Sequence, residues 1–170
     1  RMPPMPDRSY LFDTVTLGNF ALSESLDLLV RRYGGSLLVT GEVLDEIAAG
    51  VAAGYCVLSA IDERVRSGQF SQTALDVQER VVFGELLRHL GAGEASCIAV
   101  AAGRNGVVVT DDRAARASCV GRKVPFTGTI GILKASCLDG FIAVDEAEHA
   151  LAAMIRHGFY APVSRMRDIL

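Results

Sequence analysis

The chain alternates short apolar runs with longer stretches of helical periodicity, and this alternation constrains its fold more than any other feature. The apolar runs at 9–13, 36–40 and 107–110 predict buried strands, and 123–127 predicts a last strand in which Pro125 marks an edge or an end. Strands that are separated by helices pair in parallel and carry helices on both faces of the sheet. We therefore predict an α/β fold of three layers, α/β/α, with a central parallel sheet.

Helical segments fill the rest of the chain, and several have start or stop signals. Thr40 and Ser71 are expected to cap the helices that follow them, and Asp145 with Glu148 forms a D-x-x-E capping pattern. Gly158 is expected to end the helix before it. The predicted helices are 15–33 with a break near Ser23, 42–53, 55–66, 73–90, 94–103, 112–119, 129–138, 145–157 and 164–169.

The length of 170 residues indicates one domain with a sizeable core, which we place at 9–170. Residues 1–8 contain three prolines and no periodicity, so we predict a disordered N-terminus there. That stretch also lacks the apolar region of a signal peptide. No run reaches the about 20 apolar residues of a membrane span, and we expect no membrane partner.

The four cysteines show no C-x-x-C pair and no histidine at ligand spacing, so buried free thiols are expected. Disulfides and zinc are the alternatives. Free thiols are typical of a reducing cytosol, and we expect a cytoplasmic location. The cysteines are Cys56, Cys97, Cys119 and Cys137.

The net charge of −3 lacks the basic excess that many nucleic-acid binders carry. Of the 17 basic residues two are Lys, which leaves 15 Arg, and the planar guanidinium fork suits phosphates. Arg113 and Arg116 directly follow an Asp-Asp pair, which makes them candidate phosphate contacts. The alternative is an ordinary solvated helix face.

Acidic side chains stand at separated positions that a parallel sheet could gather. Asp13 ends YLFD, and Asp111 and Asp112 end VVVTDD, so they follow predicted strands; Glu46 and Glu94 lie in or at the start of predicted helices. Ligands bind such sheets beyond the carboxyl ends of the strands. Clustered carboxylates repel each other, so we expect a raised pKa in at least one, with Asp13 the most buried. Hard oxygen ligands favour Mg²⁺ or Mn²⁺, and metal-assisted chemistry on a phosphate ester.

Each acidic residue also has an ordinary structural explanation. Glu46 lies beside two other acidic residues on a helix, where solvation alone would account for it. Glu94 suits the positive end of a helix dipole, and Asp112 suits an N-cap. A purely structural explanation fits Asp13 less well, because this residue ends an apolar strand and is followed by Thr. The order and spacing of all the acidic positions together favour the functional interpretation.

The acidic positions also carry a resemblance to a known family, the PIN-domain ribonucleases. That family has a strand-end Asp followed by a small hydroxylated residue, which is similar to Asp13-Thr14. It has a V-x-x-E-like helix element after the second strand, which VLDEI with Glu46 resembles. It also has an acidic residue that opens a helix of small residues, here Glu94 in GEASCIAVA.

Later segments extend this resemblance over 9–170. The family's T-x-D element resembles Thr110-Asp111-Asp112, in which Asp112 takes the last acidic position and Asp111 is a neighbour that assists. The segment TGTIG at 127–131 and the C-terminal helix resemble a PIN-like branch that has Glu, not Asp, at the central acidic position.

The resemblance implies a three-layer PIN-like fold and a divalent-metal-dependent endoribonuclease of the kind found as toxins of toxin–antitoxin pairs. The implied cofactor is Mg²⁺ or Mn²⁺, which would activate a water and stabilise charge on the phosphate. The implied catalytic residues are Asp13, Glu46, Glu94 and Asp112, and the implied metal ligands are these four and Asp111. The candidate RNA contacts are Thr14, Thr110, Arg113 and Arg116, of which the two threonines serve equally well as strand-end hydroxyls that satisfy backbone.

The implied partners are single-stranded or loop RNA and a protein antitoxin, and a homodimer is left open. An alternative within the same fold is a binding or assembly module with a weak or inactive site.

A dinucleotide site at GAGEAS (91–96) is disfavoured because a helix, not a strand, precedes it. A phospho-acceptor receiver domain is disfavoured because the acidic pair follows a late strand. The histidines, which lack acidic partners at ligand spacing, are His89, His149 and His157.

Overall fold

The computed structural model describes residues 8–170. Its strands form one sheet of five, all parallel, in the order β3-β2-β1-β4-β5. The prediction of a disordered 1–8 concerns, apart from Arg8, residues outside the described range. The strands are β1 (Tyr10–Phe12), β2 (Leu37–Thr40), β3 (Ser71–Thr73), β4 (Val107–Val109) and β5 (Phe126–Thr127).

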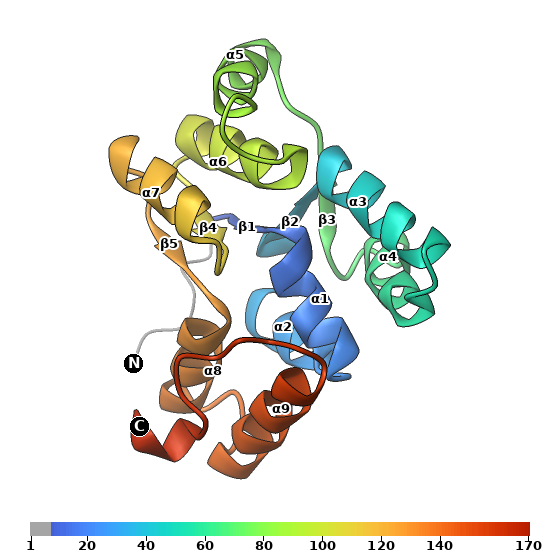
Figure 1. Cartoon of the computed structure of the whole chain (residues 1–170), viewed down its shortest axis with the longest axis vertical. Coiled ribbons are helices and arrows are strands. Elements are labelled where there is room, and N and C mark those ends of the chain that lie inside the picture. The colour runs from blue at the N-terminus through green and yellow to red at the C-terminus, as the bar shows by residue number, and fades with distance from the viewer. Residues whose placement is uncertain (1–7) are drawn as a thin grey trace.

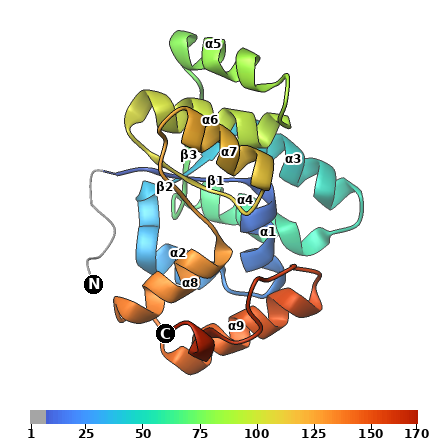
Figure 2. The ribbon, with the colours of Figure 1, turned by 60° about the vertical axis from the view of Figure 1, so that its left-hand side comes forward.

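Helices cover both faces of this sheet, so the three-layer α/β/α fold with a central parallel sheet is confirmed. In both ribbon views α6 and α7 lie on one side, with α5 outside α6, and α1 and α2 lie on the other (Figure 1, Figure 2). The helices are α1 (Thr14–Leu22), α2 (Leu26–Tyr33), α3 (Gly41–Ala52), α4 (Ser59–Arg66), α5 (Val77–Leu86), α6 (Ala92–Arg104), α7 (Arg113–Gly121), α8 (Thr129–Leu138) and α9 (Val144–Arg156). Short 3₁₀ turns are η1 (Gly34–Ser36), η2 (Cys56–Leu58) and η3 (Met166–Asp168).

The central strand β1 is buried on both faces, as a continuous apolar run predicts for a parallel sheet. Leu11 and Phe12 are both 0% exposed, and Leu11 pairs with Leu38 of β2 on one side and Val108 of β4 on the other. The chain runs from β1 to β2 and β3, then returns past β1 to β4 and β5. The order of the strands therefore reverses beside β1, and in such sheets ligands bind in the crevice at this point.

The segment before α5 differs from the prediction. Ser71 does not cap a helix over 73–90. It begins the edge strand β3, which pairs with β2, and its hydroxyl donates to Gly35 O at 2.9 Å. The helix begins at Val77 instead, behind a capping box of Asp76 and Glu79. The polar sequence of β3 carries no apolar alternation, so its strand pairing comes from the neighbouring β2 rather than from a pattern of its own.

The C-terminal segment also differs from the prediction. Residues 164–169 form only the turn η3, and α9 begins at Val144 without a side-chain cap. Asp145 pairs with Arg167, and Glu148 accepts a hydrogen bond from the backbone N–H of Met166. These two acidic residues therefore tie the C-terminal segment to α9, and Met166 is 0% exposed.

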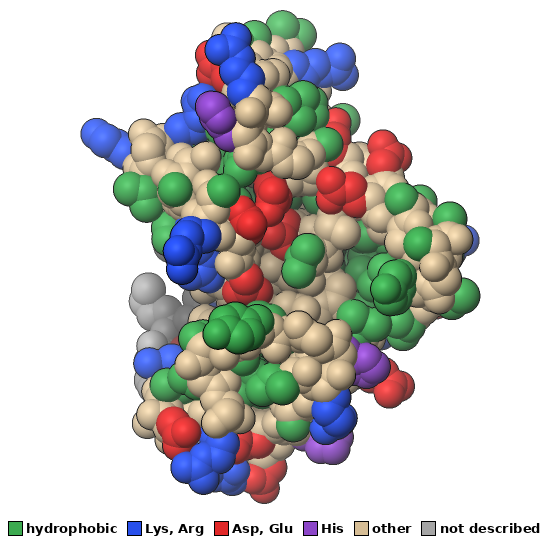
Figure 3. Space-filling model, in the orientation of Figure 1, with side chains coloured by type: hydrophobic (Ala, Val, Ile, Leu, Met, Phe, Trp, Pro, Cys, Tyr) green, Lys and Arg blue, Asp and Glu red, His purple; other side chains and the backbone are tan. Residues whose placement is uncertain are grey.

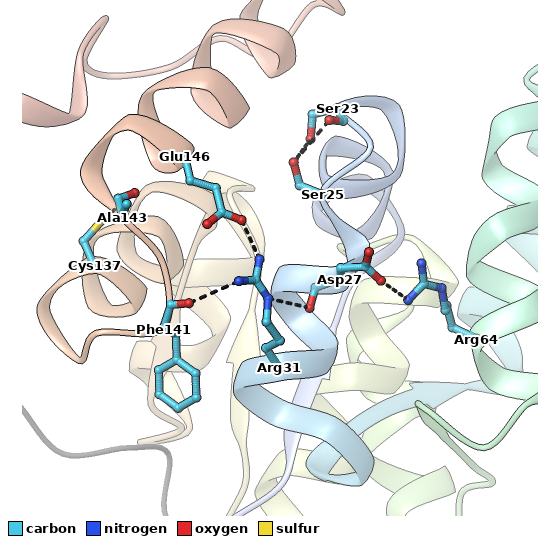
Figure 4. A network of polar contacts seen from close by, with 9 residues as sticks. All are labelled: Ser23, Ser25, Asp27, Arg31, Arg64, Cys137, Phe141, Ala143 and Glu146. Carbon is cyan, nitrogen blue, oxygen red and sulfur yellow. Dashed lines mark hydrogen bonds and ion pairs between the residues drawn. The ribbon is translucent and has the colours of Figure 1, made fainter.

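Polar contacts join α2 to α9 and to α4 (Figure 4). Arg31 donates to Glu146 of α9 at 2.5 Å and to Phe141 O at 3.3 Å. Asp27 accepts from Arg64 of α4 at 2.7 Å. Elements far apart in the sequence are thereby joined on the side of the molecule that carries α9.

The cysteines are free thiols, as predicted, although only two are fully buried. Cys97 and Cys119 are buried, Cys137 is half-buried, and Cys56 is exposed in η2. Burial raises the pKa of the Cys119 thiol to about 11. Among the helices of residues 8–170, none combines the length and the apolar character needed to cross a membrane.

Candidate active site

Asp13 lies at the carboxyl end of β1, where the chain turns directly into α1. Its Oδ1 accepts from the backbone N–H of Thr16 at 2.8 Å, which makes it the N-cap of α1, and its Oδ2 accepts from the hydroxyl of Thr110 at 2.5 Å. The residue is 2% exposed. Burial raises the pKa of Asp13 although these hydrogen bonds oppose the rise, and the charge of Asp111 adds to it.

Glu46 reaches the same region from α3. Thr40, the last residue of β2, caps this helix by accepting from Val43 N at 3.1 Å, as predicted. The two carboxylate oxygens of Glu46 accept from the hydroxyl of Thr14 at 2.5 Å and from the backbone N–H of Gly93 at 3.0 Å. Glu46 therefore links the starts of α1 and α6.

Gly93 is what allows α6 to approach Glu46 so closely. A Cβ at this position would lie 2.3 Å from Glu46 Oε1 and 2.9 Å from its Cδ. A side chain there would displace the carboxylate. Gly93 is therefore part of the site.

Glu94 lies in the first turn of α6 and is half-buried. Its pKa is raised to about 7, first by burial and then by the charges of Asp112, Asp13 and Glu46, while a backbone hydrogen bond from Gly91 opposes the rise. The carboxylates of Asp112, Asp13 and Glu46 thus all act electrostatically on Glu94. The predicted rise of pKa occurs at both Asp13 and Glu94.

The two neighbouring aspartates after β4 have different surroundings. Asp112 is exposed and caps α7, because its Oδ2 accepts from Ala115 N at 2.8 Å. The carboxylate of Asp111 accepts from Thr129 N at 3.0 Å and from the Thr129 hydroxyl at 2.5 Å. Asp111 also pairs with Arg116 at 3.5 Å. Asp112 lies close enough to Glu94 for its charge to raise the pKa of that residue, whereas Asp111 anchors the start of α8.

Three members of the acidic cluster, by which we mean Asp13, Glu46, Glu94 and Asp112, line a cavity of about 180 Å³. Its walls are formed by Asp13, Thr14, Val15, Glu46 and Glu94. Figure 3 shows acidic side chains gathered in a hollow at the middle of one face, with basic side chains beside them.

The oxygen donors of the cluster suit Mg²⁺ or Mn²⁺, and a cation would relieve the repulsion that raises the pKa of Glu94. Within residues 8–170, however, no group of three or more His, Cys, Asp or Glu side chains is arranged to hold a metal ion. The oxygens of Asp13 and Glu46 are directed to hydroxyl and amide donors of the protein. The donor chemistry fits a divalent ion, and the coordination geometry is not preformed.

The two threonines that are candidate RNA contacts donate hydrogen bonds to carboxylates of the cluster. Thr14 donates to Glu46, and Thr110 donates to Asp13 while accepting from Asp112 N at 3.1 Å. Thr110 is 0% exposed. Both hydroxyls orient the acidic cluster, and Thr110 connects Asp13 to the chain at Asp112.

Arg113 and Arg116 line a second, larger cavity of about 650 Å³ that includes Asp111. Arg116 donates from Nε to Thr110 O at 2.9 Å, and its guanidinium lies 5.1 Å from the centre of the Phe126 ring. Arg113 is exposed. Aromatic residues of this cavity, Phe126, Phe159 and Tyr160, were not among the sequence candidates, because no local pattern marks them.

Comparison with known proteins agrees with this geometry. No curated protein matches the chain. A family model described as PIN domain matches residues 9–170, which is nearly the whole chain. PIN domains are generally nucleases, enzymes that hydrolyse phosphodiester bonds. The chain therefore belongs to the PIN-domain family.

Proposed function

We propose that this protein is a divalent-metal-dependent endoribonuclease that hydrolyses RNA phosphodiester bonds. The observation that carries the proposal is the convergence of the acidic cluster at the carboxyl ends of β1 and β4. Its members come from four separate segments, and the charges of the other three raise the pKa of Glu94. Repelling carboxylates at the ligand-binding edge of a parallel sheet are typical of a site that a cation completes.

The acidic cluster would hold Mg²⁺ or Mn²⁺, and a bound ion supplies an activated water and stabilises charge on the phosphate. The chain's own part is to place the carboxylates. Thr110 fixes Asp13 at the end of the central strand, and Thr14 with Gly93 N fixes Glu46. No protein nucleophile is required for this chemistry.

RNA as the substrate is supported by the basic residues beside the cluster. Arg113 is exposed in the first turn of α7, one residue after Asp112. A guanidinium there can bind a phosphate next to the one being hydrolysed. The net charge of −3 makes such local contacts necessary, because the protein as a whole repels a polyanion.

We extend the proposal to the biological role: the protein would be the toxin of a toxin–antitoxin pair and would act in the cytoplasm. It would belong to a PIN-like branch that has Glu at the central acidic position and a T-G-T-x-G segment. The acidic cluster supports the toxin role. An antitoxin that places an Arg or Lys among these carboxylates would neutralise them in place of an ion. A neighbouring gene for a small DNA-binding protein, whose product inhibits cleavage, is the observation that tests this extension.

A cleavage assay tests the nuclease proposal. Purified protein should cleave single-stranded RNA in Mg²⁺ or Mn²⁺, and EDTA should stop it. Asp13→Asn and Asp112→Asn should each lower the rate about a hundredfold or more, because the metal's charge stabilisation is worth several kcal/mol and each ~1.4 kcal/mol is tenfold. Glu63→Gln, which removes an exposed carboxylate on α4, should cleave like the wild type. Cleavage that survives Asp112→Asn would belong to a contaminant and contradict the proposal.

A second candidate is a PIN-fold binding or assembly module with a weak or inactive site. The internal hydrogen bonds that Asp13 and Glu46 accept favour it, because they already stabilise the carboxylates without an ion. No cleavage of varied RNAs in either metal ion, together with retained RNA binding, would select this candidate.

A further inference from the structure

The 650 Å³ cavity lies directly beside the acidic cluster. Asp111 in its wall is the chain neighbour of Asp112, and Arg113 follows at the start of α7. The remaining walls come from β5, the start of α8 and the segment after α9. An extended substrate that places one phosphate at the acidic cluster would therefore enter this cavity with its next residue.

The charges of this cavity favour an anion. Two guanidiniums, those of Arg113 and Arg116, oppose the single carboxylate of Asp111. Arg116 is held in place by Thr110 O and by the ring of Phe126, so little side-chain entropy remains to be lost on binding. The part of the cavity wall formed by Arg113 and Arg116, here called the basic corner, is therefore positive although the whole chain has a net charge of −3.

The start of α8 adds further donors to the same corner. Ile130 and Gly131 lie in its first turn, where backbone N–H groups have no intrahelical carbonyl partner, and both line the cavity. Gly131 brings the helix close to β5, since a Cβ there would lie 2.3 Å from Thr127 Oγ1. Such a helix end attracts phosphate.

Tyr160 supplies an aromatic surface at the rim of this cavity. Its side chain is 96% exposed, so the ring gains almost nothing from packing in the described structure. Tyr160 also lines a neighbouring cavity of about 390 Å³, whose walls include Thr14 and Val15 of the acidic cavity. Tyr160 is therefore shared by the walls of the cavity that Arg113 lines and of the cavity that Thr14 and Val15 line.

A hydrogen-bonded helix end directly precedes Tyr160 in the chain. The helix α9 ends in a Schellman motif, in which Phe159 N donates to Met154 O at 3.0 Å and Gly158 N donates to Ile155 O at 3.0 Å. Gly158 has a φ of +103°, which favours glycine at this position. Tyr160 follows this helix end with an exposed ring, which is free to stack on another ring.

We propose that this cavity is a subsite for single-stranded RNA, in which one base stacks on Tyr160 and the adjoining phosphate binds Arg113, Arg116 and the start of α8. The inference rests on the proposed nuclease function and names its substrate class. Stacking on an aromatic ring combined with a basic groove is the usual means of binding single strands without reading their sequence. A base inside a duplex already has both faces covered, so the ring cannot reach it.

Binding measured without cleavage tests this subsite. A short fluorescently labelled single-stranded RNA is titrated with the metal-free protein in EDTA, and its anisotropy is followed. Tyr160→Ala should weaken binding about 5- to 150-fold, because base–aromatic stacking is worth about 1–3 kcal/mol. Tyr160→Phe should keep the affinity. Val77→Ala, which removes an 81% exposed apolar side chain of α5 outside both cavities that Tyr160 lines, is the control and should bind as the wild type does.

The salt dependence tests the phosphate contact. Arg113→Gln should lower the slope of log affinity against log salt by about 0.7 for one lost single-strand phosphate. Arg156→Gln removes an exposed arginine of α9 outside this cavity and should leave the slope unchanged. An Arg113→Gln protein with the wild-type slope would contradict the phosphate contact.

The outcomes separate this inference from the proposed function. If Tyr160→Ala binds single strands like the wild type, or the wild type prefers duplex RNA, the subsite is refuted whatever the cleavage assay shows. If Tyr160→Ala loses binding while the wild type never cleaves in Mg²⁺ or Mn²⁺, the subsite stands and the nuclease proposal fails.

Discussion

Glu94 combines burial with the repulsion of its neighbours, and both disfavour its ionised form. Its pKa of about 7 in the folded protein lies above the ordinary value of 4.5. The unfolded chain therefore loses this proton at lower pH than the folded protein does. Folding stability from this group is full below about 4.5 and falls as pH rises through about 7.

The variant Glu94→Gln should remove this loss. We expect the metal-free variant to melt above the wild type at pH 8 and to approach it below pH 4.5, because only the wild type must ionise a crowded carboxyl. Thermal melts in EDTA across this pH range measure the difference. Glu63→Gln controls for the loss of one negative charge. The two proteins could instead differ in melting temperature by the same amount at every pH. That result would contradict a raised pKa of Glu94 in the folded protein.

At this scale the places of Asp13 after a strand and of Asp112 before a helix could be predicted, but the contacts of the acidic side chains could not. Asp13 and Asp112 could be found because strand ends and helix caps are local features. The roles of Thr14 and Gly93 could not, because each depends on a partner that the sequence places far away: Glu46 is 32 residues from Thr14 and 47 from Gly93. Tyr160 lacked any local signal, since exposure depends on how the C-terminal segment packs.

The close approach of α3 and α6 sets the geometry of the site at the scale of elements. A Cβ at Gly93 would meet Glu46 Oε1 at 2.3 Å, whereas a Cβ at Gly91 comes no nearer than 3.8 Å to Glu94. Gly91 is the N-cap residue of α6, and Gly93 lies in its first turn. One position therefore tolerates a methyl group and the other does not.

Gly93→Ala should displace the Glu46 carboxylate and lower RNA cleavage, while the fold remains because the displaced atoms belong to the end of a flexible side chain. Gly91→Ala should cleave like the wild type. Initial rates and circular dichroism of both variants provide the check. Equal rates for the two variants would show that the position of Glu46 does not matter to the chemistry.

The helix α5 shows where pattern reasoning about elements failed. The polar edge strand β3 gives no period-two signal, so the sequence predicts Ser71 as a cap and Thr73 as the start of the following helix. The true start is fixed by the capping box, in which Asp76 Oδ1 accepts from Glu79 N at 2.8 Å and Glu79 accepts from Asp76 N at 2.9 Å. The signal was present in the sequence as D-x-x-E, but Ser71 competed with it.

Asp76→Ala should lower the free energy of unfolding by about 1 kcal/mol, because it removes a side-chain cap. Asp76→Asn should have a much smaller effect, since Asn caps almost as well as Asp. Urea denaturation of both variants provides the measurement. An equal loss in both would mean that the charge, rather than the cap, stabilises α5.

At the scale of the whole molecule, the sheet order brings the site together. The carboxyl ends of β1 and β4 are neighbours only because the chain returns past β1 after completing β2 and β3. The alternation of strands and helices predicted a parallel sheet, and the right-handed crossovers of such sheets restrict the topologies available. The order β3-β2-β1-β4-β5 itself could not be derived from periodicity, since every buried strand shows the same apolar run.

The central claim is that Asp13, Glu46, Glu94 and Asp112 share one divalent ion. Calorimetric titration of Mn²⁺ into the metal-free protein tests it most directly, because binding is measured without RNA. Replacing any one of them by its amide should weaken Mn²⁺ binding by more than the roughly 10- to 100-fold that loss of an outer-shell partner costs. Asp111→Asn should bind nearly as the wild type does, because that carboxylate is engaged by Thr129 and Arg116. Binding that survives Glu46→Gln or Asp112→Asn, or that is lost only in Asp111→Asn, would contradict the account.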